Sequence, residues 1–161
     1  MTVISTHKDP EALTMTFVAE FAAPVERVWQ VWQDPRQLER WWGPPTWPAT
    51  FERHEFTVGG ASAYHMSGPE GEKYRGWWRV TALDAPTHLE FDDGFADDDG
   101  NPNPSMPATH IVVTLAPADS GTRMTSVTRF PTLAALEQLA GMGMEEGMRL
   151  AMGQIDDILT A

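Results

Sequence analysis

The pair of residues best suited to acid–base chemistry is Glu52 and His54, two positions apart in a segment that alternates polar and apolar residues. Residues at this spacing share one face of a strand, so we expect His54 and Phe56 to face inward with Glu52 beside them. A carboxylate next to an imidazole is sufficient for general-base catalysis. Such neighbours are also common by chance, and a hydrogen-bonded histidine at the core or its rim is the interpretation that we favour.

Other catalytic and cofactor signatures fail when they are tested. His54-Glu55 is not followed by a second histidine at the spacing of a zinc protease, and no nucleophile elbow or Walker A sequence occurs. Gly141, Gly143 and Gly147 imitate part of a dinucleotide-binding loop, but they follow a predicted helix instead of a strand. The remaining histidines are His7, His65, His88 and His110. They show no ligand spacing, so we expect no catalytic residue, no metal and no cofactor.

An acidic segment resembles a fragment of a calcium-binding loop. Asp97, Asp99 and Gly100 have the correct spacing, but Phe95 and Met106 stand where the first and last carboxylates of such a loop belong. The segment is therefore predicted to be a solvated charged loop, and a weak, adventitious cation site is the alternative.

Composition limits the classes of partner. The chain has 161 residues, no cysteine and a formal net charge of −12, from 23 acidic and 11 basic residues. Disulfides and cysteine-ligated metals are excluded, and nucleic acid or an anionic membrane is disfavoured because no basic excess exists. No lysine or arginine occurs between Arg79 and Arg123, and eight acidic residues lie in that interval. No apolar leader or membrane span is apparent, so we expect a soluble, cytoplasmic protein.

Aromatic residues and methionines carry more information. Seven Trp and nine Met are many for this length. Met144, Met148 and Met152 form a stripe at helical spacing, which indicates core packing first and an adaptable ligand surface second. Gly143, Gly147 and Gly153 in the same segment weaken a helix by about 1 kcal/mol each relative to alanine. They indicate a lid with room beneath it or, alternatively, close packing of the helix on a sheet.

Periodicity places these residues on elements. Strands are predicted at Leu13–Phe21, Thr50–Val58, Ala61–Met66, Lys73–Leu83, Thr87–Asp92, Thr109–Leu115 and Thr122–Phe130. Helices are predicted after Pro24, at Pro35–Trp42, at Leu133–Ala140 and at Met144–Leu159, with Thr132 as an N-cap. A long surface loop is predicted from Asp92 to Pro107. Residues 1–11 are expected to be a flexible segment and residues 12–161 a single domain.

The order of the elements predicts an antiparallel α+β sheet whose apolar face is covered by the C-terminal helix. Space between the sheet and that helix is where a ligand would lie.

Short motifs along the chain point to a known family. They are Trp41-Trp42-Gly43-Pro44, Gly59-Gly60, Met66-Ser67-Gly68-Pro69-Glu70-Gly71, Arg75-Gly76, Pro86-Thr87-His88-Leu89-Glu90-Phe91, Gly121-Thr122-Arg123-Met124-Thr125 and Met144-Glu145-Glu146-Gly147. Over about residues 12–160 the chain resembles the SRPBCC (START-like) superfamily, in particular its AHSA/CalC-like branch of chaperone-ATPase activator homologues. The resemblance implies a helix-grip fold: a curved antiparallel sheet of about six to seven strands around a long C-terminal helix, with two short helices after the first strand and an internal apolar cavity.

The chain departs from the family pattern at Met148, where the family has a tryptophan after the glycine matched by Gly147. We expect this change to enlarge or soften the cavity mouth. The family has no shared catalytic set, and its members include cochaperone domains, small-molecule binders and resistance proteins, so the resemblance leaves function open.

Three functions remain. The leading hypothesis is non-catalytic binding or sequestering of a lipophilic, aromatic small molecule. The expected lining is Trp41 near the mouth with His54, Tyr64, Met66, Trp78, Phe91, Met124, Met144 and Met148. The second is a chaperone-ATPase cofactor or protein-interaction module using an exposed Trp77 and the acidic loop, and Trp77 is also a candidate homodimer contact. The third is a cyclase-like or hydrolase-like enzyme using His54 with Glu52.

Overall fold

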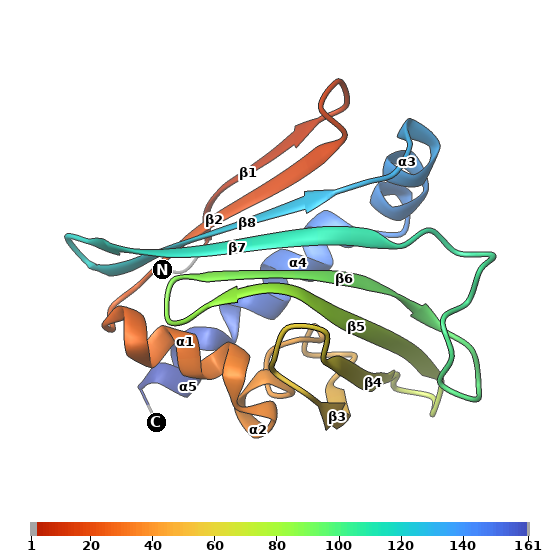
Figure 1. Cartoon of the computed structure of the whole chain (residues 1–161), viewed down its shortest axis with the longest axis horizontal. Coiled ribbons are helices and arrows are strands. Elements are labelled where there is room, and N and C mark those ends of the chain that lie inside the picture. The colour runs from red at the N-terminus through yellow and green to blue at the C-terminus, as the bar shows by residue number, and fades with distance from the viewer. Residues whose placement is uncertain (1–2, 161) are drawn as a thin grey trace.

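A computed structural model describes residues 3–160 and contains one eight-stranded antiparallel sheet (Figure 1). The strands lie in the order β1-β2-β8-β7-β6-β5-β4-β3. Their bounds are β1 Val3–Asp9, β2 Thr14–Phe21, β3 Ala49–His54, β4 Ala61–Ser67, β5 Lys73–Asp84, β6 His88–Ala96, β7 Thr109–Ala118 and β8 Gly121–Arg129. The helices are α1 Val25–Gln33, α2 Pro35–Leu38, α3 Leu133–Gly141, α4 Met144–Gly153 and α5 Ile155–Leu159. The α+β helix-grip architecture is confirmed.

The strand count differs from the expected six to seven because β1 lies within residues 1–11, where the sequence predicts a flexible segment. β1 pairs with β2 through partners such as Lys8 and Met15. The turn between them is held by the Asp9 carboxylate, which accepts hydrogen bonds from the backbone of Glu11 and Ala12. Backbone pairing therefore forms this strand, and its polar sequence gives no period-two signal to predict it. Residues 1–2 lie outside the described residues.

Alternating side chains define the inner face of the sheet. In β2, every second residue from Met15 to Phe21 is buried, and β7 and β8 follow the same pattern. In β6 the burial alternates up to Phe91, and the strand runs beyond its predicted end at Asp92 to Ala96 with residues that are all half-buried. Asp92 and Asp93 are consequently strand residues on opposite faces, and the connecting loop begins only after Ala96.

The two short helices bring aromatic residues under the sheet. The Asp34 side chain caps α2 by accepting from the backbone N–H of Arg36 at 2.9 Å, with Pro35 in the first turn. α2 ends at Leu38, earlier than the predicted Trp42, so Trp41 and Trp42 lie in the turn that follows. Both are buried in the core.

The C-terminal segment is three helices instead of a short helix followed by one long helix. Thr132 caps α3 as predicted, accepting from the backbone N–H of Ala135 at 3.0 Å. The predicted helix from Met144 to Leu159 is interrupted at Gln154, whose side-chain amide donates to the carbonyl of Gly43 at 2.7 Å. In Figure 1, α4 passes on the far side of the sheet, while α5 lies beside α1.

No helix in the described part of the chain has both the length and the apolar character needed to cross a membrane.

Candidate functional site

An aromatic cluster occupies the inner face at the centre of the sheet. The Trp78 ring stacks on Phe91 with ring centroids 4.0 Å apart and meets Trp42 edge-on at 4.9 Å. Trp32 from α1 lies 6.2 Å from Trp78 and 6.0 Å from Phe91. Stacked and edge-to-face contacts at these distances stabilise the interior by roughly 0.5–1.5 kcal/mol per pair beyond area burial. The sheet and the α1–α2 region are thereby joined into a rigid wall.

His54 lies at the rim of this cluster and is hydrogen-bonded on both ring nitrogens. Nδ1 is 2.8 Å from the Ser62 hydroxyl and Nε2 is 2.9 Å from the carbonyl of Trp32. A neutral ring that donates from Nε2 and accepts at Nδ1 satisfies both contacts. Burial lowers the pKa of His54 and keeps it in this neutral form. The favoured interpretation, a hydrogen-bonded rim histidine, fits this geometry.

Glu52 does not join His54, and the expectation of a Glu52–His54 pair on one face is wrong. The pairing of β3 with β4 slips between Phe51 and Arg53, which makes Glu52 the extra residue of a bulge. The bulge reverses the alternation, so His54 faces inward while Glu52 faces outward. There one Glu52 oxygen lies 2.9 Å from Nδ1 of His65 and accepts from the Arg75 guanidinium.

Trp41 and Met124, two other predicted lining residues, are fully buried. The Trp41 indole N–H donates to the carbonyl of Val31 at 2.9 Å, and its ring meets Trp32 edge-on at 4.7 Å. It therefore lies in the core instead of at a mouth. Met124 lies against the same helix, where its sulfur accepts from the Trp32 indole N–H at 3.4 Å.

The predicted methionines of α4 lie at a looser boundary. Met144 and Met148 are half-buried and pack against the core, as does Met66 at the end of β4. Gly147 lies between Met144 and Met148 on the same side of α4, and a Cβ placed on it meets no atom within 4 Å. The glycine therefore does not serve close packing of the helix on the sheet, which was one of the two explanations considered. Room exists beside this half of α4.

One inward residue was missed as a candidate: Asp93. It extends the alternation of Leu89 and Phe91 along β6, and this period-two continuation was the signal that could have identified it. Tyr64 donates its hydroxyl hydrogen to Asp93 Oδ1 at 2.9 Å. Asp93 keeps part of its surface exposed, yet burial raises the pKa of its carboxyl to about 7. Burial and the neighbouring Asp93 also hold the pKa of Tyr64 well above its usual value, so the phenol stays protonated.

Two buried polar atoms on the inner face have no hydrogen-bond partner among the described residues. They are the indole nitrogen of Trp78 and the hydroxyl of Thr128. Both side chains are 1% exposed. Buried polar groups in native proteins are nearly always paired, so each of these atoms has unused capacity for a water or a ligand group. Thr128 was also missed, although it lies on the buried side of β8 with Met124 and Ser126.

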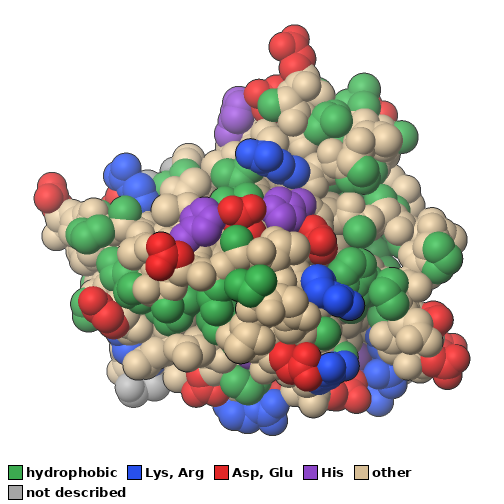
Figure 2. Space-filling model, viewed as in Figure 1, with side chains coloured by type: hydrophobic (Ala, Val, Ile, Leu, Met, Phe, Trp, Pro, Cys, Tyr) green, Lys and Arg blue, Asp and Glu red, His purple; other side chains and the backbone are tan. Residues whose placement is uncertain are grey.

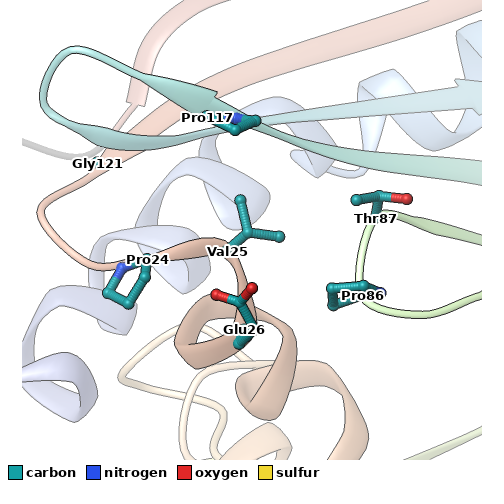
Figure 3. Close-up of a pocket in the computed structure, with 7 residues that line it drawn as sticks. All are labelled: Pro24, Val25, Glu26, Pro86, Thr87, Pro117 and Gly121. Atoms are coloured by element: carbon teal, nitrogen blue, oxygen red, sulfur yellow. The ribbon is translucent and has the colours of Figure 1, made fainter.

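Two open pockets lie away from the aromatic cluster. The first, about 440 Å³, is bounded by the start of α1 and two strand turns, with Pro24, Val25, Pro86 and Pro117 around the single carboxylate of Glu26 (Figure 3). The second, about 380 Å³, lies between β3–β5 and the connection that carries Asp98 and Asp99. No sequence motif indicated either pocket, because each is assembled from several separate turns and strands.

The outer face of the sheet carries histidines among carboxylates (Figure 2). Glu90 contacts His88 at 2.7 Å and His110 at 2.9 Å, and Asp92 contacts His110 at 2.8 Å. Hydrogen bonds from both histidines lower the pKa of Glu90. No group of three or more histidine or acidic side chains within residues 3–160 is arranged to hold a metal ion.

The acidic loop is organised by its own backbone. One oxygen of Asp97 accepts from the backbone N–H groups of Asp99 and Asn101, at 3.0 and 2.9 Å. This capping of the turn accounts for the partial resemblance to a calcium loop without a bound ion.

Comparisons with known proteins agree with this architecture. The family model described as "Activator of Hsp90 ATPase homolog 1-like protein" matches residues 22–160. Among curated proteins, none matches the chain.

Solved structures give the same result. A protein from Arthrobacter aurescens is 59% identical, with a TM-score of 0.95 over 99% of this chain and 92% of its own. Protein Ms6760 from Mycobacterium smegmatis is 49% identical, with a TM-score of 0.91 over 99% of this chain and 98% of its own. A protein from Rhodobacter sphaeroides is 25% identical, with a TM-score of 0.83 over 97% of both chains.

Proposed function

The chain belongs to the Activator of Hsp90 ATPase homolog 1-like family, and from that premise we propose that it binds a lipophilic, aromatic small molecule between the sheet and α4. Membership supports a START-like ligand-binding domain or an activator-like domain. The finer statement, a small-molecule site lined by the aromatic cluster and the α4 methionines, is the proposal.

The observation that carries it is the free space at Gly147. This glycine is half-buried, and a Cβ placed on it would meet no atom within 4 Å beyond its chain neighbours and the backbone of its own helix, so the position faces open space. Met144 and Met148 flank the space, and methionine side chains adapt to apolar ligands of different shape. We expect a ligand to enter by displacing the partly exposed first half of α4, while the Trp78–Phe91 stack stays in place.

Two unpaired polar atoms support a ligand on the inner face of the sheet. The indole nitrogen of Trp78 and the hydroxyl of Thr128 are buried on the inner face without partners. Trp78 on β5 and Thr128 on β8 are separated by β7 and β6, so a ligand acceptor would pair with one of them, and that hydrogen bond would orient the ligand in an otherwise apolar interior.

Pyrene, a neutral polycyclic hydrocarbon whose emission bands report polarity, tests the proposal. We expect saturable binding of one pyrene per chain, with the band ratio of an apolar environment. Gly147→Leu fills the free space and should weaken pyrene binding at least about tenfold.

Gly153→Leu is the matched control. It introduces the same side chain into the same helix at an exposed glycine whose Cβ position is also free, and it should leave binding unchanged. Absence of saturable binding to the unaltered chain, or equal effects of the two leucines, contradicts the proposal.

A second candidate function follows from the family description. Trp77, on the outer face, is only half-buried, and its ring lies against Gly94, where a Cβ would come within 2.7 Å of the indole nitrogen. A flat aromatic surface of this kind suits a protein contact, including a second copy of the chain. Stimulation of a chaperone ATPase that is lost in Trp77→Ala, with pyrene binding retained, would establish this function independently of the first.

The enzyme hypothesis required Glu52 and His54 to act together, and the two side chains lie on opposite faces of the sheet. His54 is neutral and hydrogen-bonded on both nitrogens, and Glu52 faces the opposite side of the sheet. We therefore propose no catalytic role for either residue.

A further inference from the structure

Asp93 is an inward-facing acid without a counter-ion. The ion pairs among residues 3–160 involve other carboxylates. For example, a Glu52 oxygen lies 3.1 Å from the guanidinium of Arg75. A Glu20 oxygen lies 2.6 Å from the guanidinium of Arg123. Asp93 is contacted by the Tyr64 hydroxyl and by the backbone of Gly94. A carboxylate has about four acceptor positions, so this one retains capacity for a further donor.

Aromatic residues are the neighbours of Asp93 on the inner face of β4 and β5. Trp78 is its cross-strand partner on β5, and Tyr64 contacts it directly from β4. Trp42 links the two, with ring centroids 4.9 Å from Trp78 and 6.1 Å from Tyr64. The faces of tryptophan and tyrosine attract a cation within about 6 Å, and the attraction strengthens where water is excluded.

The charges around Asp93 also favour a cationic ligand. Asp93 lies in the interval between Arg79 and Arg123 that contains no lysine or arginine. None of the ion pairs among residues 3–160 places a lysine or arginine against Asp93, so no fixed cation competes with a cationic ligand for this carboxylate.

We propose that the interior site takes a protonated amine carried on an aromatic or polycyclic body, with the Asp93 carboxylate as its counter-ion and the rings of Trp78, Tyr64 and Trp42 as its walls. This inference rests on the proposed function, because it names the chemical class of the ligand for the same interior. An isolated buried carboxylate is costly unless it is neutralised or paired, and an incoming ammonium supplies the missing pair.

The titration of Asp93 predicts how amine binding should change with pH. With the pKa of its carboxyl at about 7, Asp93 is mostly protonated in the free protein below neutral pH and mostly ionised above it. Tyr64 is the titratable group that faces it from β4 and remains protonated, while Trp78 on β5 and Thr109 on β7 bring no charge. Amine binding should therefore weaken as the pH falls through about 7, and binding of a neutral analogue should not.

Calorimetric titration with three probes of one shape tests the inference: 1-naphthylmethylamine, 1-naphthylmethanol and 1-naphthoate. At pH 8 we expect the amine to bind at least about tenfold more tightly than the alcohol, and the acid to bind most weakly. Asp93→Asn keeps the shape and should reduce the amine-to-alcohol ratio to about one while the affinity for the alcohol persists.

Asp92→Asn is the matched control. It removes the same charge from the neighbouring residue of β6, on the outer face, and should leave the ratio unchanged. If Asp93→Asn fails to fold, the loss of amine preference below pH 7 in the unaltered chain decides the question.

The outcomes separate the two proposals. Equal binding of the three probes, or a preference for the amine that survives Asp93→Asn, overturns the amine inference and leaves interior binding intact. A ratio that falls equally in Asp92→Asn and Asp93→Asn also overturns it, since net charge then explains the preference. No binding of any probe to the unaltered chain removes the proposed function and the inference together.

Discussion

Asp93 illustrates how the fold changes the meaning of a single residue. In the sequence it is one of eight acidic residues in a stretch without lysine or arginine. In the structure, Asp92 pairs with His110 on the outer face, whereas Asp93 faces the aromatic cluster and bonds to Tyr64. Two adjacent aspartates thus have opposite environments because consecutive residues of a strand point to opposite faces.

Burial of Asp93 should make the free energy of unfolding depend on pH. The pKa of Asp93 rises from an ordinary 3.8 to about 7, so the folded state holds a proton that the unfolded state releases. Its contribution to stability is fully present below about pH 4 and is lost as the pH rises through 7. Asp93→Asn carries no charge, and its advantage in the free energy of unfolding should grow from pH 4 to 7 and then level off, at no more than about 4 kcal/mol.

Urea unfolding at pH 4, 6 and 8 measures that difference. Asp98→Asn, which removes an exposed charge from the acidic loop, should show no such rise. An advantage of Asp93→Asn that stays flat with pH would mean that the carboxyl group titrates normally in the folded chain.

At the scale of elements, α4 is the weakly packed part of the cover. Its N-terminal half presents Met144 and Met148 half-buried, and its buried residues are Ala151 and Met152. Helices with few buried contacts open locally at low free energy. We therefore expect α4 to open more readily than α1, which is anchored by the buried Trp32 and Val28.

Gly147→Ala should stabilise the chain by up to about 1 kcal/mol, because alanine is the better helix former and the added methyl group meets no atom. Chemical denaturation measures the gain, and slower amide exchange within α4 should accompany it. Gly153→Ala, free of contacts in the same way, should give a similar gain. Destabilisation by Gly147→Ala alone would show that the space beside it is already filled.

Gln154 connects the C-terminal helices to the turn after α2. Its amide donates to the carbonyl of Gly43 at 2.7 Å and approaches that of Trp41 at 3.5 Å. Gln154→Ala should therefore lower the free energy of unfolding by about 1 kcal/mol, as expected for the loss of a partly buried hydrogen bond.

Thermal melting compares this variant with Gln138→Ala, an exposed glutamine whose described contact is a 3.9 Å approach to the sulfur of Met106. Gln138→Ala should be nearly neutral. Equal melting temperatures for both variants would mean that the Gln154 contact adds nothing to stability.

For the whole molecule, the net charge of −12 is the dominant long-range term. Acidic self-repulsion opposes the compact state and is screened by salt, since the Debye length falls from about 30 Å at 0.01 M to about 8 Å at 0.15 M. The melting temperature should rise by a few degrees over that range, and scanning calorimetry in sodium chloride measures it.

A double variant, Asp98→Asn with Asp99→Asn, provides the comparison. Both residues are exposed in the acidic loop, and their removal should reduce the salt response. A melting temperature that falls with salt would show that favourable ion pairs, such as Arg123 with Glu20, outweigh the repulsion.

The sequence by itself determined the fold class and most of the elements. Alternation in β2, β6, β7 and β8 identified inward residues such as Phe17, Phe91 and Met124, because a strand's period of two reports which face each residue takes. Family motifs added the helix-grip arrangement. The sequence did not predict β1, whose polar residues are ordered by backbone pairing alone. It also predicted one long C-terminal helix, which is interrupted at Gln154.

Only the tertiary structure decided which side chains meet. The bulge at Glu52 separated it from His54, and cross-strand register brought Tyr64 to Asp93 and Trp78 to Phe91. Trp41 was drawn from an expected mouth into the core by its bond to Val31. Periodicity describes each strand against its own axis, whereas contacts depend on register, bulges and ring orientation, which are set by packing among segments distant in sequence.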